Sequence, residues 1–215
     1  MSFMEKAAAH EPVPTRVVRA CWAILGLLTV ASITGTAFSP LLLVKSPLLL
    51  VGLAPDGRHV ALVAGRVDPW LLMSVTVLRR SLYSLAVFGL GSAYGDAAVS
   101  WIEERAQGVG KALRALERLF ARAGALLLLG LPFLTVCILA GAARTRVLVF
   151  LPALVAGHSI WVFCTVWLGT RFAAQAQLVV DFFAERLVES TVVCVALMVA
   201  YQFFTRRKRA GAPPT

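Results

Sequence analysis

The uncharged apolar run between Arg122 and Arg144 constrains the fold of this chain most. Its centre reads GALLLLGLPFLTVCILAG, with Pro132 near the middle and Gly130 two residues before it. Proline removes a backbone donor and clashes with the carbonyl four residues earlier, so a helix breaks there. Each arm then measures roughly 12 to 15 Å at 1.5 Å per residue, about half of the ~30 Å hydrocarbon core. The run therefore predicts a re-entrant hairpin over residues 124–143 rather than a membrane crossing.

An earlier stretch repeats this order of parts. Leu48–Leu53 reads LLLVGL, and 78 residues later Leu126–Leu131 reads LLLLGL. A proline follows each (Pro55 and Pro132), then an Ala-Gly pair and a long apolar helix. The pattern predicts a first re-entrant hairpin over residues 39–65, broken at Pro55, and an internal repeat. Chance similarity in a chain rich in Leu, Ala and Gly is the alternative. Repeats around broken helices are typical of transporters with a midplane site.

Composition places the chain in a membrane. Hydrophobic residues make up 59% of its 215 residues and charged residues only 15%, more apolar surface than a soluble domain of this size would bury. The 21 Lys and Arg exceed the 11 Asp and Glu, but they cluster at the ends of apolar runs. This arrangement favours anionic phosphate headgroups of membrane lipids as partners and argues against nucleic acid.

The remaining segments complete an all-α integral membrane protein. Transmembrane helices are expected at 17–38, 69–95, 147–170 and 187–205; a signal peptide is the alternative for the first. A cytoplasmic tail (1–16) and a basic tail (206–215) flank them, and 97–122 is an amphipathic cytoplasmic segment. Residues 171–189 form an external loop or interfacial helix. The fold class is thus an inverted repeat of re-entrant hairpin plus transmembrane helix, with additional helices at both ends.

Most Lys and Arg fall in the tails, in 97–122 and just after the second hairpin. Loop Lys and Arg mark the cytoplasmic side, so both termini are expected to be cytoplasmic in the inner, cytoplasmic membrane. The first hairpin then enters from the outer side and the second from the inner side. A homo-oligomer is compatible with the sequence.

Arg79 and Arg80 lie near the centre of the predicted helix 69–95. An arginine there costs about 2.5 to 3.5 kcal/mol on insertion scales, so something must compensate. Because a guanidinium fork matches phosphate oxygens, both are candidate ligands of a phosphate headgroup. The alternatives are an ion pair with Asp56 or Asp68, or snorkelling to the membrane surface.

His158 falls at the repeat position of Arg80 and is a third candidate for the headgroup site; a packing histidine is the alternative. Asp56 and Arg58 flank the first hairpin break and are candidates for a coupling or polar pathway, although Asp56 could equally belong to turn chemistry.

No catalytic site, metal site or cofactor is predicted. The cysteines Cys21, Cys137, Cys164 and Cys194 lie in four different apolar segments without a CxxC pair, as buried small residues do. The histidines are scattered, and no acid pair stands one helical turn apart in a span.

Residues 46–169 resemble the DedA family, also called the SNARE-associated Golgi or VTT-domain family. The resemblance rests on the Ala-Gly closing each hairpin and on GLGSAYGDAAVSWIEER, LERLFARAG and GHSIWVFCTVWLG. It implies two oppositely oriented re-entrant hairpins and movement of lipids across the bilayer. The chain departs from the family pattern in the second hairpin, which keeps Pro132 but has no arginine, and we expect Arg79 and Arg80 to supply the positive charge instead.

The sequence therefore predicts a flippase or scramblase for a phosphate-bearing lipid, either a polyprenyl phosphate or a phospholipid. The alternatives are a non-transporting membrane scaffold and, less favoured, an enzyme of lipid headgroups.

Overall fold

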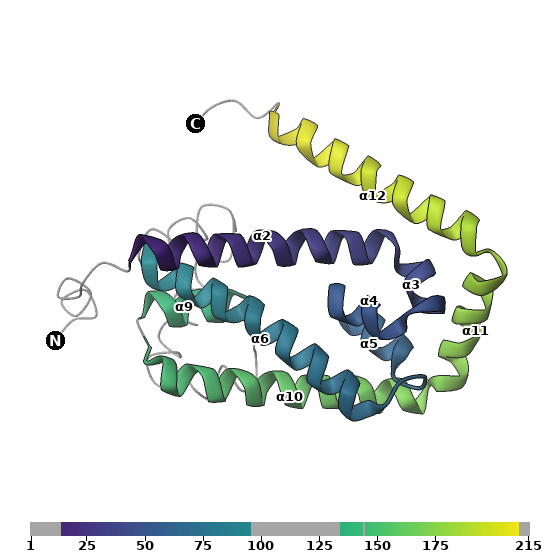
Figure 1. Ribbon diagram of the computed structural model, residues 1–215, viewed down its shortest axis with the longest axis horizontal. Helices are drawn as coiled ribbons and strands as arrows, with labels where there is room; N and C mark the ends of the chain where they lie inside the picture. The colour runs from purple at the N-terminus through teal and green to yellow at the C-terminus, as the bar shows by residue number, and fades with distance from the viewer. Residues whose placement is uncertain (1–13, 96–133, 144, 211–215) are drawn as a thin grey trace. The chain divides into compact units, whose positions relative to one another are not determined.

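The computed structural model describes residues 14–95, 134–143 and 145–210, the last seven of these by their backbone alone. All regular structure in these ranges is α-helical (Figure 1). The helices are α2 (Thr15–Ala37), α3 (Ser39–Lys45), α4 (Pro47–Leu53), α5 (Gly57–Val63), α6 (Pro69–Tyr94), α9 (Leu134–Ala142), α10 (Val147–Arg171), α11 (Ala173–Glu185) and α12 (Leu187–Ala210).

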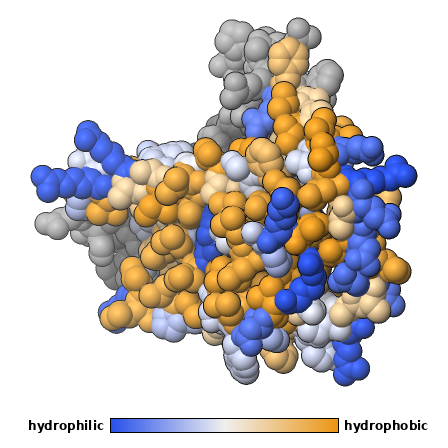
Figure 2. Space-filling view, turned by 45° about the vertical axis from the view of Figure 1, so that its right-hand side comes forward, coloured by the Kyte–Doolittle hydropathy of each residue, from blue (hydrophilic) through white to orange (hydrophobic). Residues whose placement is uncertain are grey.

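Three of these helices, α2, α6 and α10, are long and apolar enough to cross a membrane. With 23, 26 and 25 residues, they extend over roughly 35 to 39 Å at 1.5 Å per residue, more than the ~30 Å hydrocarbon core. Large apolar side chains remain exposed on them, including Leu148 at 88% and Leu78 at 72%. Apolar side chains cover most of the surface in view in Figure 2. These features are those of a membrane protein.

The ends of α6 follow from its sequence. The Asp68 carboxylate accepts a hydrogen bond from the Leu71 amide at 2.9 Å, which caps the helix, and Pro69 occupies the first helical position, where a missing N–H costs nothing. At the other end Gly95 adopts φ +49°, a left-handed conformation that glycine reaches without strain.

The chain divides into two compact units, residues 1–28 with 77–162 and residues 29–76 with 163–215. The boundary passes through α2, α6 and α10, so each long helix contributes one segment to each unit. We refer to them as unit 1 and unit 2.

The core of unit 1 forms where α6, α9 and α10 pack together. Phe88 of α6 stacks on Phe150 of α10 with ring centroids 4.1 Å apart. Cys137 of α9 is fully buried in the same cluster. A Cβ added at Gly91 would overlap the Ile138 carbonyl oxygen, so backbones of α6 and α9 are in direct contact, as small residues allow between membrane helices.

Unit 2 contains the predicted first hairpin. Its first arm is two short helices, α3 and α4, because Pro47 starts a new helix after Ser46. The return arm is α5, which contacts α4, and Pro55 lies between the two. A Cβ at Gly169 of α10 would lie 2.5 Å from the Ala61 carbonyl oxygen of α5, a second direct contact between helix backbones.

Helices α11 and α12 also belong to unit 2, and both contact α3. Residues 171–189, expected as a loop or interfacial helix, are α11 and the start of α12. The described apolar part of α12, Leu187–Phe203, is shorter than the three long helices. The predictions for residues 1–13, 97–122 and 124–133, including Gly130 and Pro132, and for the tail beyond residue 210 lie outside the described residues.

Candidate functional site

Polar side chains gather halfway along two of the long helices of unit 1. On α6 these side chains are Arg79, Arg80, Ser81 and Ser84, and on α10 the polar side chain is His158, near the middle of the helix. We call these five residues the mid-helix cluster. The sequence indicated the arginines and the histidine because charged or ionisable residues are conspicuous in an apolar helix. The two serines were missed, since serine is common in membrane helices.

Ser84 and His158 connect α6 to α10. The Ser84 hydroxyl and His158 Nε2 lie 3.2 Å apart in a hydrogen bond whose donor depends on the imidazole tautomer. Ser84 is 6% exposed and His158 only 4%. Within the described part of the chain, His158 Nδ1 and the Ser81 hydroxyl are buried without a hydrogen-bond partner. Such groups cost free energy when they are left unpaired, so this cluster can accept a further polar group.

The two arginines have different surroundings. Arg79 donates a hydrogen bond from Nη2 to the carbonyl oxygen of Leu28 in α2 at 2.7 Å. It thereby ties α6 to α2. Arg80 lies on α6 four residues, about one helical turn, before Ser84, the hydrogen-bond partner of His158. Both guanidinium-bearing side chains are half-buried. The structure thus pairs His158 with Ser84, one helical turn from Arg80, while Arg79 has a contact that also holds α6 to α2.

The candidate pathway residues lie at the hairpin break in unit 2. Arg58 and Asp56 form an ion pair with 3.3 Å between Nη2 and Oδ2, and their side chains are 66% and 53% exposed. An exposed pair of this kind contributes about 0.2 to 1 kcal/mol. His59 beside them is buried, with Nδ1 3.1 Å from the Ala54 carbonyl oxygen. Asp68 serves as the cap of α6.

A cavity of about 530 Å³ opens beside this break, and we call it the hairpin groove. Its walls are mainly apolar, with a few polar side chains among them. The lining residues are Thr36, Ser39, Pro40, Leu43, Leu50, Arg58, His59, Leu62, Phe183, Cys194, Leu197, Met198 and Tyr201. His59 belongs to the hairpin itself, whereas the residues of α11 and α12 carried no signal for this groove in the sequence, because only the fold brings them to the hairpin.

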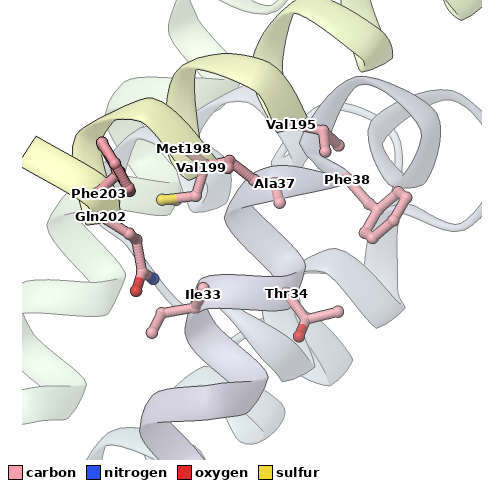
Figure 3. A pocket seen from close by; sticks show the side chains of 9 residues that line it. All are labelled: Ile33, Thr34, Ala37, Phe38, Val195, Met198, Val199, Gln202 and Phe203. Carbon is pink, nitrogen blue, oxygen red and sulfur yellow. The ribbon is translucent and has the colours of Figure 1, made fainter.

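A second cavity of unit 2, of about 400 Å³, lies between the end of α2 and α12 (Figure 3). Ile33, Thr34 and Ala37 face Val195 and Met198 across it. Its lining contains no charged side chain, and its polar side chains are Thr34 and Gln202.

In the described ranges, no three His, Cys, Asp or Glu side chains are grouped so as to hold a metal ion. Comparison with protein-family models, with curated proteins and with solved structures gives no match. The resemblance to the DedA family therefore stays a prediction.

Proposed function

We propose that this protein moves a phosphate-bearing lipid, a polyprenyl phosphate or a phospholipid, between the two leaflets of the cytoplasmic membrane. The observation that carries the proposal is the mid-helix cluster, in which Ser84 and His158 form a hydrogen bond, with Arg80 one helical turn before Ser84, halfway along two helices long enough to cross a bilayer. A cation at the middle of a membrane helix costs free energy, and the packing of two neutral helices does not require one.

The chemistry of the cluster suits a phosphate. Guanidinium N–H groups, serine hydroxyls and an imidazole N–H are all donors, and a phosphate oxygen accepts from each of them. Two donor-capable atoms, the Ser81 hydroxyl and His158 Nδ1, are buried and have no partner in the described residues. A headgroup that reached the cluster would both neutralise the arginine charge and pair these atoms, while its chains remained in lipid.

The packing within each unit supports two equivalent hairpins. In unit 1, α9 contacts α6 at Gly91, and in unit 2, α5 contacts α10 at Gly169. These two glycines are paired in the sequence repeat, 78 residues apart. We take α5 and α9 as corresponding arms of the two re-entrant hairpins, with opposite orientations in the membrane, as inverted-repeat transporters have.

Reconstituted protein tests the proposal. Liposomes would contain a trace of fluorescent lipid, either polyprenyl phosphate or phospholipid, and a membrane-impermeant quencher would report the fraction that reaches the outer leaflet. The wild type is expected to accelerate exchange. Arg80→Gln should reduce the rate to that of empty liposomes, because a neutral amide cannot offset a phosphate charge at membrane depth.

Arg79→Gln serves as the comparison for a structural effect. It removes the bond to Leu28, so it should lower thermal stability. Arg19→Gln, at an exposed position of α2, should leave the rate unchanged. Normal transport by the Arg79→Gln/Arg80→Gln double variant would refute the headgroup site. Headgroup hydrolysis without exchange would indicate an enzyme, and neither activity would indicate a scaffold.

A further inference from the structure

The hairpin groove combines an apolar chamber with one accessible cation. Leu62 and Leu197 contribute apolar surface to its wall, and Leu197 is 65% exposed. Arg58 lies on its lining with a side chain that is 66% exposed. A space of this kind matches a ligand that is apolar over most of its length and anionic at one end.

Arg58 is available to such a ligand. Arg58 Nη2 lies 3.3 Å from Asp56 Oδ2 in an exposed ion pair, and such pairs are weak. A carboxylate or phosphate head could accept two parallel N–H bonds from the guanidinium, which is stronger than a single exposed contact. Ser39 and Tyr201 add hydroxyl groups to the same lining. An anionic head would therefore compete with Asp56 for Arg58.

The groove has room for a long acyl chain. At about 30 Å³ for a group the size of a water molecule, a cavity of about 530 Å³ corresponds to roughly 18 such groups, and a methylene group is close to this size.

We propose that the hairpin groove binds a single-chain amphiphile with an oxyanion head, the chain lying among the leucines and the head on Arg58. Its residues differ from those of the mid-helix cluster. The binding does not depend on the proposed lipid movement, and it can be measured where no membrane separates two compartments.

The test uses the full-length protein in detergent micelles and radiolabelled oleate. The wild type is expected to bind oleate saturably, with weaker binding of oleyl alcohol, which lacks the charge. Arg58→Gln should weaken binding about 10- to 100-fold, the loss expected for charge-assisted hydrogen bonds. Asp56→Asn should tighten it about 2- to 5-fold, because the competing exposed ion pair disappears. Partition of oleate into micelles is common to all variants and cancels in the comparison.

Two further variants distinguish binding in the groove from a general effect of losing a positive charge or of losing the fold. Arg171→Gln removes a cation that lies over the Trp167 ring, 5.2 Å from its centroid, and outside the groove lining, so binding should stay unchanged. Leu197→Trp adds bulk to the groove from a position that is 65% exposed, so the protein should fold and lose oleate. A long-chain alkyl phosphate competing with oleate would show which oxyanion is preferred. Equal affinities of Arg58→Gln and Arg171→Gln, or unsaturable binding to the wild type, would overturn the proposal.

Discussion

Replacing Gly141 by alanine tests the close packing of α9 on α6. The added Cβ would overlap the Phe88 carbonyl oxygen and lie 2.8 Å from the Ser92 amide nitrogen and 3.0 Å from the Gly91 carbonyl carbon. All three are backbone atoms of α6, so no side chain can rotate away. Normal contact at about 3.5 to 4.0 Å requires the two helices to separate by more than about 1 Å.

The expected change in the free energy of unfolding of Gly141→Ala follows from two opposing effects. Overpacking of a well-packed site costs about 1 to 3 kcal/mol, whereas alanine gains about 0.5 to 1 kcal/mol over glycine inside a helix. Because the clash is with backbone, we expect a net loss of about 1 to 2 kcal/mol. For a chain of this length that corresponds to a fall in melting temperature of about 2 to 8 °C.

Thermal unfolding in detergent, followed by tryptophan fluorescence, measures the effect. Gly26→Ala is the matched control, since it makes the same chemical change inside α2, where an added Cβ meets nothing within 4 Å. Its melting temperature should rise by about 1 to 4 °C, the gain expected from helix propensity alone. If Gly141→Ala melted at or above the temperature of Gly26→Ala, the direct backbone contact would be wrong.

Two other substitutions probe the packing of unit 1 and the start of α6. Phe150→Ala should lower the free energy of unfolding by about 3 to 5 kcal/mol, because it leaves a cavity next to the stacked Phe88 ring. Phe163 is 56% exposed on the same helix, so Phe163→Ala should melt near the wild-type temperature. Similar losses of stability in both variants would contradict the packing. Asp68→Ala should cost about 0.5 to 2 kcal/mol by removing the cap on the Leu71 amide, and Asp68→Asn, which keeps a side-chain oxygen, should recover most of it in the same melting assay.

Local chemistry was sufficient to locate the long helices. An apolar stretch in a membrane must satisfy its own backbone polar groups, and a helix does so within one segment. The predicted helix at 69–95 corresponds to α6 because Asp68 and Pro69 form a starting signal and Gly95 a stop, all read from neighbouring residues. The same reasoning places Pro55 between α4 and α5. It did not foresee that α3 and α4 would be separate helices, although Pro47 marks the division.

Pairing across the fold was decided only by the tertiary structure. Ser84 and His158, which share a hydrogen bond, are 74 residues apart in the sequence. Arg79 donates a hydrogen bond to the carbonyl oxygen of Leu28, 51 residues away. The hairpin groove needs α11 and α12 beside α3. A residue's own neighbours determine its helix, since helical hydrogen bonds span four residues. Which faces then meet depends on how side chains of distant segments fit together, and a one-dimensional pattern of apolar and small residues is satisfied by many such fits.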